Sequence, residues 1–199
     1  MRLEFKKFEE IKSFLEEDKV FVFSCDNCGT EDIKDKNRKI TEFLNNNHLK
    51  ILGIINLNPE KCNIFSLREI IDKEYIMETR FILTFTCGGL PQVLPSIINA
   101  KVIPAVNTLK IETGRKLGSF ARLCSACGEC WIHLTGNLCM EKLCPKKMRN
   151  GPCGGAKDGF CEVYDKRLCP FVILFRKEGE DVFINLIPPK DFSKILLQE

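Results

Sequence analysis

The sequence has 199 residues, of which 44% are hydrophobic and 29% are charged, so it is long enough for one or two domains with a buried core. Its 30 basic and 27 acidic residues nearly balance at a net charge of +3, and no Lys/Arg cluster lies on a helix-like face, which argues against a nucleic-acid partner. The first residues mix charged and apolar side chains without an apolar run of signal-peptide or membrane-spanning length, so we predict a cytoplasmic protein with no membrane partner.

The first hundred residues alternate between helical and strand-like patterns. Apolar residues recur near a helical period in residues 3–15, whereas residues 20–23 form a short apolar run that is typical of a buried strand. Ser66 followed by Glu69 is a capping-box pattern, which predicts that a helix begins there. The predicted elements are a helix at 3–15, a strand at 20–23, a helix at 35–47, a strand at 49–55, a helix from Ser66, a strand at 81–85, a helix at 91–100 and a strand at 102–106.

This alternation predicts an α/β fold with a parallel sheet. Helices of this length between strands form right-handed βαβ crossovers, so residues 1–112 are expected to be a small Rossmann-like or flavodoxin-like domain. The segment after the first predicted strand reads SCDNCG instead of G-x-G-x-x-G, so it does not predict dinucleotide binding.

The pattern changes beyond residue 112. Residues 113–170 have no sustained period, contain eight of the twelve cysteines and have too few apolar residues for a core of their own, so bound metal is the expected source of order. This stretch predicts a loop-rich, ferredoxin-like metal-binding region. Residues 171–199, with FVILF, VFINLI and a helical pattern at 192–197, predict a strand pair and a helix that pack back.

Twelve cysteines in a chain that we expect to be cytoplasmic indicate metal binding. Reducing compartments disfavour structural disulfides, and a chain with its own core does not need the disulfides that stabilise small secreted domains. A disulfide scaffold is the less favoured alternative.

The four cysteines of the first region all follow predicted strands, and they are Cys25, Cys28, Cys62 and Cys87. The carboxyl ends of parallel strands meet at one edge of a sheet. If the first strand lies between the second and the third, as in the flavodoxin-like order, the four thiols form one site for an iron–sulfur cluster or zinc. Gly29 and Gly88 lie beside these cysteines, where tight turns let backbone N–H groups point toward sulfur. The alternative, above all for Cys62, is a buried cysteine that acts as a small apolar residue.

The second region holds a ferredoxin-like cysteine pattern. Cys124, Cys127 and Cys130 form C-x-x-C-x-x-C, and Cys144 and Cys169 each precede proline, as the last cysteine of a ferredoxin run does. Zinc sites prefer two separated C-x-x-C pairs, so two 4Fe-4S clusters are favoured over zinc here. The fourth ligand of the triplet is expected to be Cys144 or Cys169, and interleaved ligation stays open. The eight expected ligands are Cys124, Cys127, Cys130, Cys139, Cys144, Cys153, Cys161 and Cys169.

Other residues near the cysteines have secondary expected roles. Gly154 and Gly155 are expected to donate backbone hydrogen bonds to sulfur, and Trp131 to keep water off a cluster. His133 is expected at the surface rather than as a ligand. The nearby cations are expected to be solvated, with electrostatic tuning as the alternative, and they are Lys146, Lys147 and Arg149.

The cysteine array of residues 124–169 resembles a known family. The string CSACGECWIHLTGNLCMEKLCPKKMRNGPCGG, with GFCEV after it, is similar to the C-terminal-type domain family associated with methylenetetrahydrofolate reductase, found in the small subunit of the two-subunit, acetogen-type bacterial enzyme. The cysteine pair after the first strand, the CG at Cys87 and the PAVNT at 104–108 agree more loosely. The resemblance implies a subunit with iron–sulfur clusters and sometimes zinc, which works beside a flavin-containing TIM-barrel subunit that binds the folate.

From this resemblance we predict an accessory subunit that relays electrons from a donor protein to the flavin of its partner, which reduces methylenetetrahydrofolate to methyltetrahydrofolate. The chain is expected to have no catalytic site of its own, and it contains no G-x-S-x-G, H-E-x-x-H or P-loop motif. The alternatives are a zinc-binding structural module without a redox role and a free-standing ferredoxin-like carrier.

Overall fold

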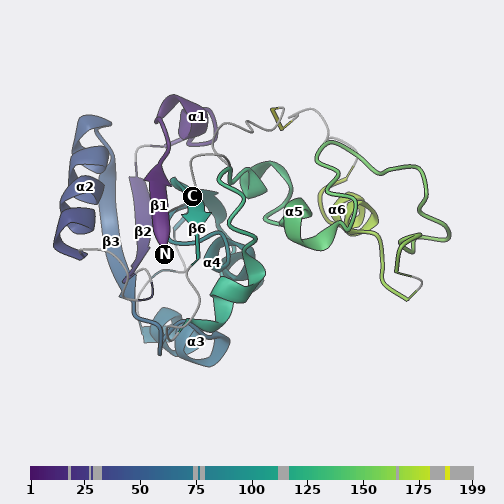
Figure 1. Ribbon diagram of the computed structural model, residues 1–199. Coiled ribbons are helices and arrows are strands. Elements are labelled where there is room, and N and C mark those ends of the chain that lie inside the picture. Colours follow the sequence, from purple (N-terminus) through teal and green to yellow (C-terminus); the bar gives the residue numbers. More distant parts are fainter. Residues whose placement is uncertain are drawn as a thin grey trace.

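A computed structural model gives the fold, and it describes residues 1–17, 19–26, 28, 33–73, 76, 79–111, 117–164, 166–179 and 187–188. In this part of the chain, four strands form a parallel sheet in the order β3-β2-β4-β5, and two strands form a separate antiparallel pair, β1-β6 (Figure 1). The strands of the parallel sheet are β2 (Lys19–Cys25), β3 (Lys50–Leu57), β4 (Phe81–Phe85) and β5 (Lys101–Pro104).

The order of the parallel sheet is the flavodoxin-like one, which is one of the two arrangements that the sequence leaves open. The first predicted strand is β2, and it pairs with both β3 and β4. In the register, Val22 lies between Ile54 of β3 and Leu83 of β4. Because all these strands run in the same direction, the loops that follow β2, β3 and β4 meet at one edge of the sheet.

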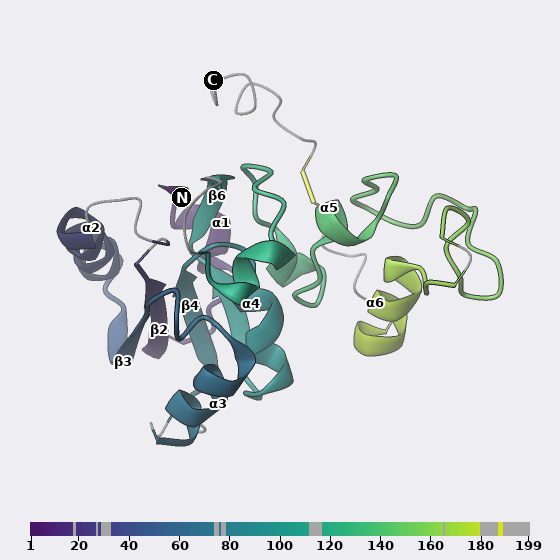
Figure 2. The same cartoon turned by 60° about the horizontal axis from the view of Figure 1, so that its bottom comes forward.

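Both faces of the central strands β2 and β4 are covered, which explains their continuous apolar runs, whereas the edge strand β3 is largely exposed. Along β2, Val20 and Val22 face the side of α1 (Glu9–Lys12) and α2 (Ile33–Asn46). Phe21 and Phe23 alternate with them and face the side of α3 (Ile64–Lys73) and α4 (Leu90–Val93) (Figures 1 and 2). The two apolar cores therefore lie on opposite sides of one sheet, as in a doubly wound fold.

The single helix predicted over residues 3–15 is wrong. Residues Arg2–Phe5 form β1, which pairs with β6 (Val106–Lys110), and only the short helix α1 follows. Leu3 and Phe5 alternate with charged residues, so the same apolar positions fit a strand, and pairing with β6 selects that structure. The strand predicted at 102–106 is likewise divided, because β5 ends at Pro104 and the chain then enters β6.

Two predicted helices begin or end at other residues than expected. The helix α3 begins at Ile64, because Asn63 caps it: the Asn63 Oδ1 accepts a hydrogen bond of 3.0 Å from the backbone N–H of Ser66. Ser66 therefore lies inside the helix and is not its cap. The helix predicted at 91–100 is short, since α4 gives way to a 3-10 turn, η2 (Leu94–Ser96), at Pro95, which has no N–H to donate.

The C-terminal region is built of short helices and loops, and α5 and α6 lie to one side of the parallel sheet (Figures 1 and 2). The FVILF segment, predicted as a strand, lies in α6 (Pro170–Glu178), where Phe171 and Leu174 are buried on one helical face and Pro170 occupies the first turn. Of the remaining predicted tail, all except residues 187–188 lies outside the described residues. The other elements here are η3 (Ser119–Leu123), η4 (Ile132–Leu134) and α5 (Met140–Leu143).

None of the helices in the described ranges combines the length and the apolar character that a membrane crossing requires.

Candidate metal centres

The twelve cysteines line three cavities, four to each cavity. We name these cavities A, B and C in the order in which the chain first reaches them. Cavity A is lined by Cys25, Cys28, Cys62 and Cys87. Cavity B is lined by Cys124, Cys127, Cys130 and Cys139. Cavity C is lined by Cys144, Cys153, Cys161 and Cys169.

Cavity A lies at the carboxyl edge of the parallel sheet, as the strand order predicts. Cys25 is the last residue of β2, Cys62 precedes α3, and Cys87 follows β4. The remaining lining is largely apolar and includes Met1, which is buried. Gly29, expected to point its N–H group toward sulfur here, lies outside the described residues.

Burial favours the protonated form of two thiols of cavity A, those of Cys62 and Cys87. It raises the pKa of Cys62 to about 11, and the neighbouring Cys25 and Cys28 thiols add to this shift. Burial, together with the Cys124 and Cys25 thiols, raises the pKa of Cys87 well above its usual value. A metal that binds here must therefore displace protons, which couples its binding to pH.

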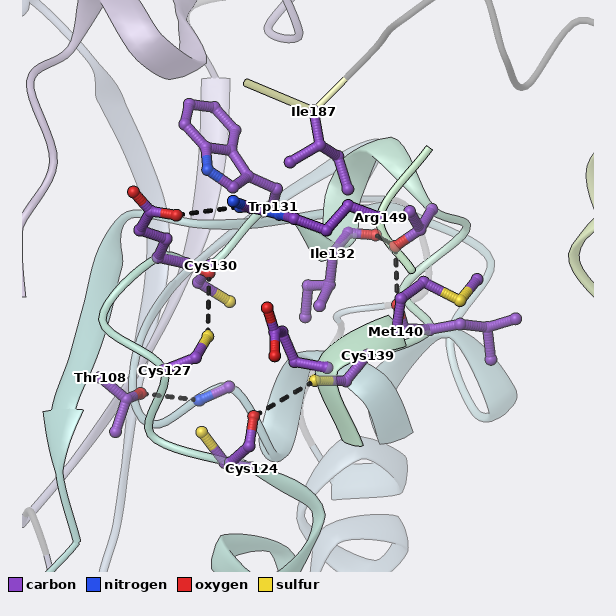
Figure 3. A pocket seen from close by; sticks show the side chains of 16 residues that line it. Thr108, Cys124, Cys127, Cys130, Trp131, Ile132, Cys139, Met140, Arg149 and Ile187 are labelled. Carbon is purple, nitrogen blue, oxygen red and sulfur yellow. Dashed lines mark hydrogen bonds and ion pairs between the residues drawn. The ribbon is translucent and has the colours of Figure 1, made fainter. Parts of the chain in front are cut away.

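Cavity B brings Cys139 to the C-x-x-C-x-x-C triplet, and the sulfurs surround one space (Figure 3). The prediction that Cys144 or Cys169 would be the fourth thiol is therefore corrected, since both line cavity C. The reason is the turn that follows the triplet. Thr135 caps it by donating its hydroxyl to the Leu138 carbonyl at 2.6 Å, and the chain returns so that Cys139 lies directly before α5.

Two side chains of β6 hold the backbone of cavity B in place. The Asn107 Oδ1 accepts a hydrogen bond of 2.9 Å from the backbone N–H of Cys130. The Thr108 hydroxyl accepts one of 3.1 Å from the backbone N–H of Gly88 (Figure 3). Both side chains are buried. The PAVNT segment resembles the family pattern, but its Asn107 and Thr108 had no predicted role. Polar residues within an apolar strand are the signal that could have identified them.

Trp131 lines cavity B, in agreement with its expected role as cover, and Ile187 lines the same cavity (Figure 3). Arg149, expected to be solvated, is largely buried and forms an ion pair with Glu129 at 2.9 Å, with side-chain exposures of 16% and 10%. Burial raises the pKa of the Cys139 thiol to about 11. It also raises the pKa of the Cys130 thiol, although the nearby Lys6 ammonium opposes that shift.

Cavity C includes the exposed cysteine Cys153, whereas its Cys144 and Cys169 are buried. A small core supports it, with Phe171 and Leu174 of α6 packed against Met140. Phe171 and Leu174 lie beyond residue 170, so the tail supplies part of the core for the cysteine-rich region. The loops are closed by backbone hydrogen bonds such as that from Cys161 N–H to Arg167 O at 2.9 Å.

The glycines of the NGPCGG segment do not line cavity C among the described residues. Gly154 has a φ of +80°, which favours glycine, and a side chain there would meet open space. A Cβ on Gly155 would meet the Glu162 carboxylate, which itself pairs with Lys146. The hydrogen bonds from Gly154 and Gly155 to sulfur stay a prediction. Gly88, by contrast, lines cavity B.

The three cavities follow one another through short covalent connections. Cys87 lines cavity A, and the next residue, Gly88, lines cavity B, where its Cβ position is 3.3 Å from the Sγ atoms of both Cys124 and Cys130. The helix α5 joins the other two, because Cys139 of cavity B precedes it and Cys144 of cavity C follows it. Cavity B thus lies between A and C along these connections.

The donor sets fit an iron–sulfur cluster. Each cavity offers four thiols, which as thiolates are the soft ligands that iron–sulfur clusters and zinc prefer. Within the described ranges, no three Cys, His, Asp or Glu side chains converge on a point where they could hold one metal ion. The thiols instead surround empty spaces of about 510, 340 and 300 Å³ for B, A and C, which include open solvent.

His133 is not the surface residue that we expected. Its ring packs edge-on against Phe14 at 4.6 Å between centroids, and its two ring nitrogens are buried without a hydrogen-bond partner among the described residues. Burial lowers the pKa of His133 from its usual 6.5 to about 3, and the positive charges of Lys6 and Lys101 contribute.

His133 should make the folded protein sensitive to acid. Between pH 6.5 and 3 the unfolded chain binds a proton at His133 that the folded chain does not, so the free energy of unfolding falls as the pH drops through this range. The expected slope is at most about 1.4 kcal/mol per pH unit. Urea unfolding of the wild type and of His133→Leu at pH 7 and 5.5 measures it. The titratable groups that both proteins share contribute equally to the pH dependence of their unfolding free energies. An equal pH dependence in the wild type and in His133→Leu would therefore contradict the lowered pKa of His133.

The fold and these cavities together define the class of the protein: a doubly wound α/β domain followed by a cysteine-rich extension of short helices and loops. Residues 103–193 match the model of a protein family described as the C terminal of methylene-tetrahydrofolate reductase. The matched range includes every cysteine of cavities B and C and none of cavity A. Searches of curated proteins and of solved structures found no significant match.

Proposed function

We propose that this chain is an electron-transfer subunit of a methylenetetrahydrofolate reductase. In this proposal, cavities B and C each hold a 4Fe-4S cluster, and cavity A holds a further cluster or zinc. The observation that carries it is the division of all twelve cysteines into three groups of four in successive cavities, two of them within the family match.

The proposed reaction needs two electrons and two protons for each methylenetetrahydrofolate that becomes methyltetrahydrofolate. Iron–sulfur clusters exchange single electrons, whereas a flavin accepts electrons singly and delivers them as a hydride equivalent. The flavin and the folate belong to a TIM-barrel partner subunit, and a donor protein supplies the electrons. This chain then needs no acid or base of its own, and its working residues are cysteines.

The residues around the cavities have the features that a relay needs. Trp131 and Ile132 cover cavity B with apolar surface, which limits contact of water with a bound group. Cavity C has an exposed cysteine, Cys153, at which a donor protein can approach the bound group. Cavities A and B are separated by a single peptide link between Cys87 and Gly88, so electrons would have a short path between them.

Metal analysis and electron paramagnetic resonance of anaerobically purified protein test this proposal. We expect about eight iron atoms per chain if cavity A holds zinc and about twelve if it holds a third cluster, with matching acid-labile sulfide. Dithionite should bleach the visible absorption and produce paramagnetic signals. Colourless protein with stoichiometric zinc, no iron and no signal would instead establish the zinc-binding structural module.

Pairing with a flavoprotein tests the second half of the proposal. The dithionite-reduced chain, freed of excess dithionite, should reduce the flavin of a co-expressed methylenetetrahydrofolate reductase subunit in a stopped-flow experiment. A free-standing ferredoxin-like carrier would purify as a monomer and would form no stable complex with that subunit. Iron-loaded protein that neither binds nor reduces the flavoprotein would reject the reductase role while leaving the clusters in place.

A further inference from the structure

Two lysines are buried beside the cavities, which is unusual because lysine is seldom fully buried. Lys36 of α2 is 4% exposed and lies beside cavity A. Lys6, directly after β1, is 3% exposed and lies beside cavity B. Sequence reasoning did not single out either residue. The signal for Lys36 is its position one turn before Ile40 and two turns before Leu44, on the stripe that α2 buries.

Lys36 directs its ammonium at a cysteine of cavity A. Its Nζ donates a hydrogen bond of 2.6 Å to the Cys25 carbonyl and lies 3.7 Å from the Cys25 Sγ. The helix α2 carries this lysine over the end of β2, where Cys25 is the last residue. The charge is therefore placed against the sulfur itself.

Lys6 has the corresponding position at cavity B. Its Nζ donates a hydrogen bond to the Cys130 carbonyl and lies 4.3 Å from the centroid of the Trp131 ring, in a cation–π contact. Both cavities therefore have the same arrangement: a buried ammonium on the backbone carbonyl of one of the four cysteines. The lysines come from different elements, one after β1 and the other in α2, so this similarity is not a result of sequence repetition.

A fixed positive charge affects the two oxidation states of a cluster differently. Each added electron makes the cluster and its four thiolates more negative, so a nearby cation stabilises the reduced state more than the oxidised one. The effect is large where water is excluded and small at an exposed cation. A charged lysine that is buried beside a cluster thus raises the reduction potential of that cluster.

We propose that Lys36 and Lys6 are redox-tuning residues, each raising the reduction potential of the group bound in its own cavity, Lys36 in cavity A and Lys6 in cavity B. This inference rests on the proposed function and, for Lys36, on a cluster rather than zinc in cavity A, so zinc with about eight iron atoms per chain would overturn the role of Lys36. It assigns to each lysine an electrostatic role that differs from a purely structural one. The charge, and not the shape of the side chain, should therefore control the potential.

Redox titration of the full chain, monitored by paramagnetic resonance, tests the proposal with neutral and charged replacements. Lys36→Met should lower the equilibrium constant for reduction in cavity A by about tenfold or more, a shift of about 59 mV to more negative potential for one electron. Cavity B should be unaffected. Lys6→Met should lower the potential in cavity B by a similar amount and leave that in cavity A unchanged. Lys36→Arg and Lys6→Arg keep the charge and should recover most of the potential. The redox transition that disappears in Cys62→Ser is assigned to cavity A, and the one that disappears in Cys139→Ser is assigned to cavity B.

Matched controls come from exposed lysines next to the buried ones. Lys39→Met lies in the same helix as Lys36, where the Lys39 side chain is 52% exposed and pairs with Asp35. Lys7→Met changes the exposed neighbour of Lys6. Both controls remove one positive charge from the chain, so they should leave both potentials at the wild-type values if burial next to the cysteines is what matters.

The outcomes separate this inference from the function on which it rests. Clusters present with unshifted potentials in Lys36→Met and Lys6→Met would overturn the tuning role alone, as would shifts equal to those of the exposed controls. Wild-type protein without iron would overturn both proposals. If a Met variant loses its cluster, the Gln and Arg variants at the same position are compared. A cluster that is retained only in the Arg variant supports the need for the positive charge. Loss of the cluster in all three variants would show that the lysine has a merely structural role.

Discussion

Replacing Cys139 with serine is expected to remove the cluster of cavity B, and replacing Cys144 with serine is expected to remove that of cavity C. The two thiols are separated only by the single-turn helix α5, yet they line different cavities. Each variant should lose about four iron atoms, because a 4Fe-4S cluster needs its four cysteine ligands. Iron analysis and paramagnetic resonance of the anaerobically purified variants measure this loss.

Pairs of substitutions provide the control for this assignment. Cys139→Ser combined with Cys124→Ser changes two thiols of cavity B and should cost no more iron than either change alone. Cys139→Ser combined with Cys144→Ser affects cavities B and C and should cost about eight iron atoms. Equal iron content in the two double variants would show that the three groups of four thiols are not the ligand sets.

Replacing Gly89 with alanine is expected to destabilise the whole protein. The Cβ atom at this position would lie 1.9 Å from the carbonyl oxygen of Phe120 and 2.6 Å from its carbonyl carbon. These atoms are backbone, so they cannot rotate away as a side chain would. Phe120 is itself buried in the core and belongs to η3, the turn directly before Cys124. We expect a loss of about 3 kcal/mol or more in the free energy of unfolding, at the upper end of overpacking effects.

The adjacent glycine provides a matched control for that experiment. In Gly88→Ala the added methyl group would lie 3.3 Å from the sulfurs of Cys124 and Cys130, a tight contact that involves side chains rather than backbone. This variant should keep most of its stability to urea while its cavity B holds less iron. Gly89→Ala with a wild-type unfolding midpoint would contradict the close approach between the α4 turn and the backbone of η3.

Local patterns were sufficient to predict much of the sheet. The residues of β2, β3 and β4 are apolar runs separated by polar helices, and this alternation is a property of neighbouring residues that any reader of the chain can detect. The convergence of the cysteines in cavity A followed from strand order alone, because parallel strands end at one edge. The family resemblance of the cysteine array is confirmed over residues 103–193 because its spacing is also local.

Contacts between distant residues could not be predicted in the same way. Residues 2–5 form a strand because β6 supplies hydrogen-bond partners more than 100 residues later, whereas their apolar spacing also fits a helix. Likewise, the segment 171–175 is rich in β-forming residues, but Pro170 and the small core with Met140 place it in a helix. Tertiary packing overrides a weak local preference in both cases.

The sequence alone therefore determined the parallel α/β class of the fold and the family resemblance of the cysteine array, since both depend on residue type and local spacing. Only the tertiary structure decided that Cys139 joins the triplet, that Cys144 belongs to cavity C, and that Lys6 and Lys36 lie against the cysteines. The physical reason is that thiols and ammonium groups act through space over a few ångströms. Such distances arise from how turns and helices return the chain, and residue spacing does not record them.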